Sequence, residues 1–236
     1  MQVRYWDSLA AAYDSLYVSE WSLIENGVVR QHLSWLAGIE EAKVLDLGCG
    51  TGLGYEICHA INATIEYTGI DISPSMIEIC KKKWPKGTFK LLSMDNLSGV
   101  ASDHFDVVIS LFSSFSFSDK PRCTLPEVYR VLRPGGMTYI SLLSKWSLRR
   151  LLNRHLSSIE YYYTRNSVEE FVVPAWVFSK KEVVRLFNWT GFKSCHVQGL
   201  GIFSGLFERP YLWSLDQRLS NFFPDLTHML TVTAEK

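Results

Sequence analysis

The chain has 236 residues, of which 47% are hydrophobic, enough to form the core of one large α/β domain or two small ones. Lys and Arg together number 24, and so do Asp and Glu, so the net charge is zero and no long-range field recruits nucleic acid or acidic lipid. Five cysteines occur without a Cys-x-x-Cys pair, which favours reduced thiols over disulfides or a structural metal site: Cys49, Cys58, Cys80, Cys123 and Cys195.

The N-terminal stretch MQVRYWDSLAAAYDS carries Arg4 and Asp7 and has no apolar core, so it does not resemble a secretion signal. No apolar run reaches the roughly 18 residues of a membrane span. We therefore expect a cytoplasmic protein without a cleavable signal. The hydrophobic pattern predicts two helices before the first strand, at residues 5–17 and 22–37.

Short apolar runs then alternate with segments of helical period, the pattern of βα units that build a mostly parallel sheet. Strands are predicted at residues 43–47, 66–70, 89–92, 105–111 and 137–143. Ser73 and Pro74 are typical of the cap and first position of a helix. Thr124 with Glu127 predicts a capping box for the helix that ends before residues 134–136.

Two later connections are long, residues 144–178 and 199–225. Structureless loops of this length are unusual in a compact domain, so we expect both to contain helices or strands. In residues 145–156 the leucines would lie along one side of a helix and the Lys and Arg residues on its other sides. Such a helix could lie at a lipid surface, or it could pack on its own domain.

The stretch VLDLGCGTGLG, residues 44–54, places glycines between a predicted strand and a predicted helix. Such a turn lets a ligand lie against bare backbone. No Gly-Lys-Ser/Thr follows, so the loop is not a phosphate loop. A G-x-G-x-x-G fingerprint is also excluded, because Leu53 and Tyr55 stand where its last glycine would be.

Three acids follow or end three successive predicted strands: Asp46, Asp71, which lies 23 residues after Gly48, and Asp95. Since open α/β sheets bind ligands at the carboxyl ends of their strands, these acids should line one crevice. They would repel a phosphate, favour a cation and accept from ribose hydroxyls. The alternative is that the glycines form only a tight turn and the acids cap helices.

Together, VLDLGCGTG, YTGIDIS, SMDNL, FDVVIS and EVYRVLRPGG resemble the successive motifs of class I S-adenosylmethionine-dependent methyltransferases of the small-molecule type, over residues 44–143. The resemblance implies an α/β, Rossmann-like, doubly wound sheet of seven strands with an antiparallel last strand and helices on both faces. The segments 179–189, 192–198 and 228–235 fit the helix and strands that complete that fold.

A single methyltransferase domain, residues 1–236, follows from the resemblance. It would comprise an N-terminal helical cap (1–40), a cofactor-binding half (41–143) and substrate-side insertions at 144–178 and 199–225.

The resemblance implies that Gly48, Gly50 and Gly52 pass under the ribose and methionine of S-adenosylmethionine (product, S-adenosylhomocysteine). Asp46 would hold the methionine ammonium end and Asp71 the ribose hydroxyls. S-Adenosylmethionine is a nucleoside with a sulfonium and no phosphate, in agreement with an acid-lined crevice.

Around the adenine, the resemblance places Ile72, Met76, Asp95 and Asn96, with Asp95 accepting from the adenine amino group.

Leu111 and Phe112 would border the methyl-donor side. Tyr13 belongs to a Tyr-Asp-x-x-Tyr segment similar to one that closes over the donor in many small-molecule members, and its ring could shield the sulfonium. The alternative is an aromatic side chain that packs its helix on the sheet.

Methyl transfer depends mainly on the alignment of donor and acceptor, which can lower the activation free energy by about 7–11 kcal/mol, whereas a general base lowers it by roughly 3–5 kcal/mol. The sequence names no base: His155 and His228 are the candidates that could face the crevice, and each has a structural alternative. Residues 110–117, SLFSSFSF, lack the Asn-Pro-Pro-Tyr of adenine- and glutamine-modifying relatives, which argues against a nucleic-acid substrate.

The aromatic long connections favour a small, partly apolar acceptor such as a natural product, a glycoside or a lipid-linked molecule, methylated on O or N. Packing of the same rings in the core is the competing interpretation. A module that binds S-adenosylmethionine or a partner protein without turnover is the alternative function.

Overall fold

The computed structural model describes residues 2–155, 157–165, 170–203 and 210–236. Its strands are β1 (Lys43–Leu47), β2 (Glu66–Asp71), β3 (Thr88–Leu91), β4 (Phe105–Ser110), β5 (Leu132–Ser144), β6 (Ile159–Arg165), β7 (Glu170–Phe178), β8 (Lys193–Leu200) and β9 (Met229–Glu235). Its α-helices are α1 (Gln2–Ala10), α2 (Glu20–His32), α3 (Leu53–Ile61), α4 (Pro74–Lys83), α5 (Pro121–Val131), α6 (Leu148–Leu152), α7 (Lys180–Thr190) and α8 (Trp213–Phe222).

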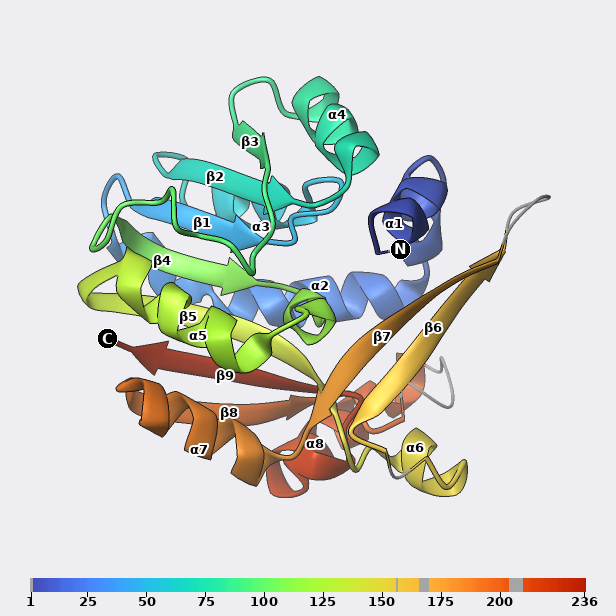
Figure 1. Cartoon of the computed structure of the whole chain (residues 1–236). Coiled ribbons are helices and arrows are strands. Elements are labelled where there is room, and N and C mark those ends of the chain that lie inside the picture. Colours follow the sequence, from blue (N-terminus) through green and yellow to red (C-terminus); the bar gives the residue numbers. More distant parts are fainter. Residues whose placement is uncertain (1, 156, 166–169, 204–209) are drawn as a thin grey trace.

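Seven strands of the nine-stranded sheet follow one another in the order β3-β2-β1-β4-β5-β9-β8, and β7, followed by β6, also pairs with the end of β5 (Figure 1). The first five are parallel, while β9 runs antiparallel between β5 and β8. This arrangement confirms the predicted Rossmann-like sheet with an antiparallel last strand. The order reverses between β1 and β4, so the crevice outside their carboxyl ends is the expected ligand position.

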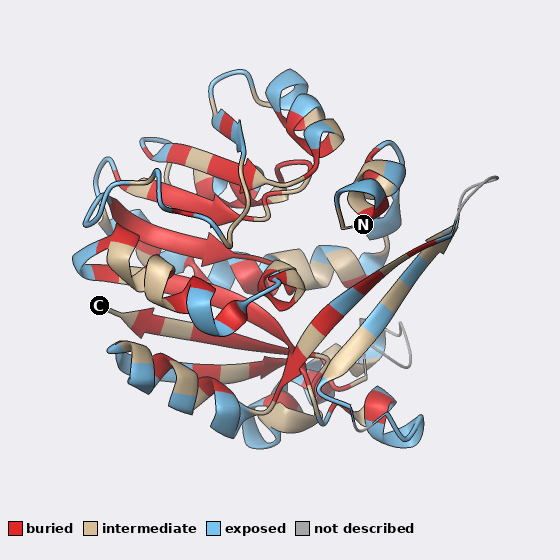
Figure 2. Ribbon diagram, viewed as in Figure 1, coloured by how far each residue is buried: buried red, intermediate tan, exposed pale blue. Residues whose placement is uncertain are grey.

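The central parallel strands β1 and β4 are buried on both faces, as Figure 2 shows, whereas β3 at the edge of the sheet is largely exposed. Leu45 and Val108 pack toward α5 and α7, whereas Val44, Val107 and Ile109 pack toward α2, α3 and α4. Successive strand residues point to opposite faces, so one short strand supplies side chains to both cores.

Two helix starts follow from local chemistry. Ser73 caps α4 by accepting from the Met76 N–H at 3.1 Å, and Pro74 occupies the first turn, as predicted. Ser179 and Glu182 form a capping box at the start of α7.

The predicted capping box at Thr124 and Glu127 is wrong. Helix α5 begins earlier, at Pro121, so Thr124 lies inside it and its hydroxyl donates to Asp95, while Glu127 pairs with Arg130 at 2.8 Å. Proline at the first position started the helix before the Thr-x-x-Glu pattern was reached.

The long connections contain structure, as predicted. The first holds α6 and the hairpin of β6 and β7, which extends from the end of β5, and the second holds α8 with short 3₁₀ turns at Pro210–Leu212 and Pro224–Leu226. The predicted helix at 5–17 is α1 followed by a separate 3₁₀ turn at Tyr13–Tyr17. The other N-terminal helix is likewise α2 plus a 3₁₀ turn at Ser34–Gly38.

The interfacial helix considered for 145–156 is not formed. Helix α6 has only five residues, and Leu156 lies outside the described residues. Arg150, expected away from the buried side, is 4% exposed and pairs with Glu160. No described helix is long and apolar enough to cross a membrane.

Candidate functional site

The glycine turn lies at the carboxyl edge of the sheet, between β1 and α3. Gly48 donates to the Ile70 carbonyl at 2.8 Å, which continues the β1–β2 ladder into the turn. Gly50 and Gly52 have φ of +53° and +93°, values that L-residues rarely adopt. A Cβ on Gly50 would meet only the Tyr13 ring, at 3.6 Å, so this glycine borders open space.

Gly52 has a different role from the one expected. A Cβ there would overlap the Trp84 ring at 2.6 Å, so the absence of a side chain lets the turn pack on the end of α4. Gly52 is not among the residues that line the cavities of the site.

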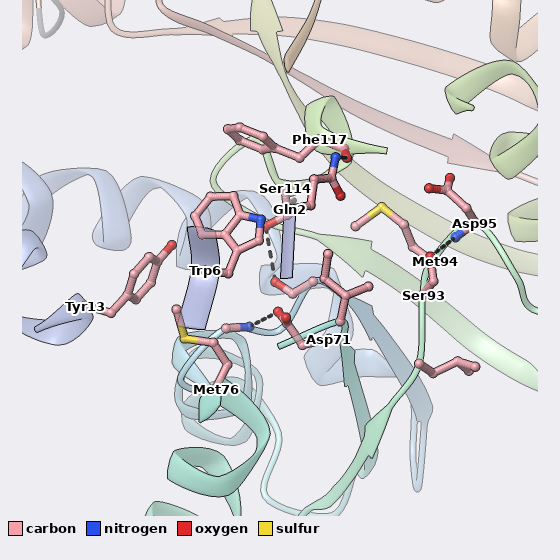
Figure 3. A pocket seen from close by; sticks show the side chains of 14 residues that line it. Gln2, Trp6, Tyr13, Asp71, Met76, Ser93, Met94, Asp95, Ser114 and Phe117 are labelled. Carbon is pink, nitrogen blue, oxygen red and sulfur yellow. Dashed lines mark hydrogen bonds between the residues drawn. The ribbon is translucent and has the colours of Figure 1, made fainter. Parts of the chain in front are cut away.

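A narrow crevice runs from Gly48 and Gly50 past the ends of β2 and β3 (Figure 3). Its described lining comprises Gln2, Trp6, Tyr13, Gly48, Gly50, Asp71, Ile72, Met76, Leu92, Ser93, Met94, Asp95, Ser114 and Phe117. We call this space the donor crevice.

Asp71 is held rigidly on the crevice wall. Its Oδ2 accepts from the Gly50 N–H at 3.0 Å and its Oδ1 from the Ser73 N–H at 2.9 Å. Burial raises the pKa of Asp71, and these hydrogen bonds oppose that rise. Because each carboxylate oxygen has two lone pairs, the side chain can still accept from a ligand's hydroxyls.

Asp46 lies in an adjoining pocket lined by the glycine turn, Leu111 and Phe112. Buried Tyr67 donates to its Oδ2, whereas Oδ1 is buried without a hydrogen-bond partner among the described residues. Burial, with a smaller effect of the Asp71 charge, raises the pKa of Asp46 to about 7. An unsatisfied carboxylate oxygen beside a pocket is suited to receive a cationic group such as an ammonium.

Asp95 lines the crevice, but its carboxylate also ties the loop after β3 to α5. It accepts from the hydroxyls of Ser118 and Thr124 and from the Asp119 N–H at 2.8 Å. Asn96 is exposed, accepts from Ser98 at 2.7 Å and does not line the crevice, so the structure does not bring it into the site.

Helix α1 and the turn after it lie over the donor crevice. Asp7 accepts from the Ser73 hydroxyl at 2.5 Å and the Ser75 N–H at 3.1 Å, at the start of α4. Asp14 accepts from the Thr51 hydroxyl at 2.5 Å and pairs with Lys83 at 2.8 Å. We call the segment 2–17 the lid.

The lid contributes residues that sequence reasoning missed. Trp6 lines the crevice, and its ring contacts Phe117 edge-on with centroids 5.0 Å apart. Trp6 and Tyr13 are seven residues apart, a spacing that puts two aromatic side chains on one side of a helical segment and could have signalled a shared surface.

A larger cavity of about 390 Å³ adjoins the crevice and shares Trp6, Tyr13, Ser114 and Phe117 with it. Its described lining is Tyr5, Trp6, Leu9, Tyr13, Leu16, Tyr17, Glu25, Phe112, Ser113, Ser114, Phe117, Leu143, Tyr162, Tyr163, Thr164, His228 and Met229. We call this space the aromatic cavity. Its size suits a small molecule.

The two candidate histidines separate clearly. His228 lines the aromatic cavity, and burial lowers its pKa. His155 is exposed and lines none of these spaces. The first long connection supplies Tyr162, Tyr163 and Thr164 to the wall, whereas no described residue of 199–225 lines it.

The turn after β4 is strained beside both spaces. Phe112 and Ser113 have φ of +49° and +65°, although neither is glycine. The Ser113 N–H donates to Ser141 at 3.1 Å, which anchors the turn to β5. Such strain persists only where surrounding contacts hold it, and it is frequent at functional sites.

No group of three or more potential metal ligands occurs within the described part of the chain. The five cysteines are unpaired thiols in the structure.

A family model described as a methyltransferase domain matches residues 44–136. Among curated proteins, demethylmenaquinone methyltransferase of Chlorobaculum tepidum is 30% identical over 194 residues, covering 70% of this chain and 75% of that protein. Phthiotriol/phenolphthiotriol dimycocerosates methyltransferase of Mycobacterium leprae is 36% identical over 101 residues, covering 40% and 35%.

An uncharacterized protein of Methanocaldococcus jannaschii is 29% identical over 166 residues, or 66% of this chain. The chain spans 59% of the length of that protein and 35% of the length of the Mycobacterium leprae methyltransferase. A solved S-adenosylmethionine-dependent methyltransferase from Archaeoglobus fulgidus shares the fold with a TM-score of 0.65 at 15% identity, covering 95% of this chain and 98% of that one.

Proposed function

Because this chain belongs to the class I S-adenosylmethionine-dependent methyltransferases, we propose that it transfers a methyl group to a small, partly apolar acceptor held in the aromatic cavity. The proposal rests on the observation that this cavity adjoins the donor crevice and shares four lining residues with it, Trp6, Tyr13, Ser114 and Phe117. A donor and an acceptor bound in these two spaces would therefore lie next to each other, both in contact with the shared side chains.

The residues present fit S-adenosylmethionine. Asp71, fixed by two backbone N–H groups, is placed to accept from ribose hydroxyls, and the unsatisfied oxygen of Asp46 is suited to the methionine ammonium. Ile72 and Met76 offer an apolar surface to the adenine, beside Asp95. The bound cofactor supplies a methyl group already activated by its attachment to a positively charged sulfur.

The protein's own contribution is then to align the acceptor and exclude water. Tyr13 and Trp6 of the lid cover the crevice, and Asp7 and Asp14 hold the lid on α4 and the glycine turn. Alignment of this kind lowers the activation free energy of a bimolecular reaction by about 7–11 kcal/mol.

We infer that three segments of the chain have separate roles in this function. Residues 1–40 provide the cap, 41–143 the cofactor half, and the hairpin within 144–178 one wall of the aromatic cavity. The two named relatives act, by their names, on demethylmenaquinone and on phthiotriol dimycocerosates. For this chain we infer only that the acceptor has an apolar part, in keeping with the aromatic walls.

The donor site is tested by Asp71→Ala, with Glu66→Ala as the control at the opposite, exposed end of β2. Each hydrogen bond to a charged group contributes about 1.5–3 kcal/mol, so calorimetric titration with S-adenosylhomocysteine should show affinity reduced by roughly 10- to 100-fold in the first variant only. Equal affinity in both variants would remove Asp71 from the site.

The reaction is tested by incubating the protein with methyl-labelled donor and a small-molecule cell extract. Label should enter a small molecule. Binding of S-adenosylhomocysteine without any transfer would favour the non-catalytic alternative, and label found only in protein or nucleic acid would reject the acceptor class.

A further inference from the structure

A second large groove, of about 730 Å³, lies between the start of α5, the end of β7 and one side of α7 (Figure 1). On α7 its lining residues Glu182, Arg185, Leu186 and Trp189 recur at helical spacing, so they share one side of the helix. The groove has no described lining residue in common with the donor crevice, the pocket of Asp46 or the aromatic cavity. We call this space the tryptophan groove.

Two tryptophans give the groove flat apolar surfaces. Trp189 on α7 is 73% exposed and Trp176 on β7 is half-buried, and among the described residues neither ring packs against another aromatic ring. Buried Val177 and Phe178 and half-buried Leu186 line the same space. A flat apolar molecule in the groove would therefore cover ring surface that now faces water.

The groove also carries cations whose side chains have no partner in the described part of the chain. Lys120 and Arg122 approach it from the start of α5, and Arg185 from α7. No described residue forms a hydrogen bond or an ion pair with any of these three side chains. Their charges are therefore available to an anion in the groove.

The two acids of the groove already have partners of their own. Glu182 pairs with Lys145 at 3.6 Å, and the Asp119 carboxylate accepts from the Gln2 side chain at 3.2 Å. Because three cations line the groove against these two acids, its lining has an excess of positive charge. This excess favours an anionic ligand over a cationic one.

We propose that the tryptophan groove is a binding site for a small aromatic anion, a flat ring system that bears a carboxylate or a phosphate. The Trp176 and Trp189 rings contact the ring system, and the Arg185 guanidinium, four positions before Trp189 on the same side of α7, pairs with the anionic group. A guanidinium matches two oxygens of a carboxylate or phosphate, and the volume of the groove is that of a small-molecule site. Since the groove is separate from the spaces assigned to methyl transfer, its ligand binds in addition to donor and acceptor.

The test is a calorimetric titration in the presence of excess S-adenosylhomocysteine, which fills the donor crevice. It compares 1-naphthyl phosphate and 1-naphthoate with neutral 1-naphthol and with inorganic phosphate. Arg185→Gln and Trp189→Ala remove the guanidinium and the ring. The matched controls are Lys181→Gln, an exposed cation of α7 outside the groove, and Phe222→Ala, an exposed ring of α8. All four side chains are exposed, so each variant should fold.

Both aromatic anions should bind about tenfold or more tightly than naphthol or phosphate, and their affinity should fall as the salt concentration rises. Arg185→Gln and Trp189→Ala should each weaken the binding of naphthyl phosphate by about tenfold or more, and the two controls should stay within about twofold of the wild type. Equal affinity of the wild type and Arg185→Gln, or equal binding of naphthol and naphthyl phosphate, overturns the proposal.

Cys123 gives a second readout that depends on where the ligand binds. Its thiol is exposed and lines the groove, whereas half-buried Cys195 does not line it. Saturating naphthyl phosphate should slow the alkylation of Cys123 by iodoacetamide severalfold and leave that of Cys195 unchanged, as followed by mass spectrometry. Unchanged alkylation of Cys123 would place the ligand outside the groove and reject the site.

Discussion

Two carboxylates of the site differ at the scale of single residues. Asp71 accepts hydrogen bonds from two backbone N–H groups, whereas one buried oxygen of Asp46 has no partner among the described residues and the pKa of Asp46 is raised to about 7. Above about pH 7 the protein without its cofactor therefore carries a destabilising charge at Asp46, which a bound ammonium would neutralise.

The Asp46→Asn variant tests whether the buried carboxylate destabilises the folded protein. Between pH 5 and 7 the carboxyl of Asp46 binds its proton more tightly in the folded than in the unfolded protein. The free energy of unfolding of the wild type should therefore fall as the pH rises, by at most about 1.4 kcal/mol per pH unit and by roughly 3 kcal/mol over the whole interval. Urea unfolding at pH 5 and pH 8 should show this loss in the wild type and in exposed Glu66→Gln, but not in Asp46→Asn, which should also bind S-adenosylhomocysteine more weakly. A wild type with equal stability at both pH values would contradict the assignment.

Gly50 and Gly52 of the glycine turn also differ in what surrounds them. Ala at either Gly50 or Gly52 adds backbone strain of about 1–2 kcal/mol, because both have positive φ. Only at Gly52 does the new Cβ also overlap Trp84. Thermal unfolding should show Gly52→Ala as the less stable variant, and calorimetry should show Gly50→Ala as the one whose cofactor affinity falls beyond its loss of stability. The reverse pattern would mean that Gly50 does not border the cofactor.

At the scale of elements, the first long connection is held by one buried cation. The Arg150 guanidinium pairs with Glu160 at 2.7 Å and donates to the carbonyls of Lys145 and Ser157, so it joins α6 to the start of the hairpin. Its bonds stay within the connection, which therefore carries its own polar core.

Removing that cation should loosen the hairpin. Arg150→Met leaves Glu160 without its buried partner and should lower the free energy of unfolding by about 3–5 kcal/mol, whereas Arg149→Met, at an exposed neighbour, should change it little. Denaturant titration of the two variants measures the difference. Equal stability would show that the pair makes no net contribution.

At the scale of the whole molecule, the lid connects distant parts of the chain. It packs on α4 and on the β6–β7 hairpin, and its acids bond to residues of α4 and the glycine turn. Few of its residues are buried, so it should belong to the least stable part of the fold.

Hydrogen exchange should show this directly. Lid amides should exchange faster than those of β1 and β4, and S-adenosylhomocysteine should slow exchange around Tyr13 and in residues 48–54, with fuller protection of the hairpin only when an acceptor is present. Asp7→Ala should weaken the cofactor-induced protection of the lid by removing its bonds to Ser73 and Ser75. A lid already fully protected without cofactor would contradict its role as a closing element.

The sequence by itself determined the parallel half of the sheet and the donor side of the site. Strand periodicity, the glycine turn and the acids at strand ends are local signals, and the carboxyl ends of parallel strands must meet at one edge. Asp71 and Asp95 were accordingly found on the donor crevice, and Asp46 in the pocket that adjoins it.

Only the tertiary structure decided the acceptor side, because its walls come from segments far apart in sequence with no shared pattern: the lid, the turn after β4, the hairpin and the start of β9. The same holds for individual roles. Gly52 packs against Trp84, Asn96 faces solvent, and His228 rather than His155 reaches the cavity. A residue's type states what chemistry its side chain can perform, but packing over long sequence separations determines which neighbours it meets.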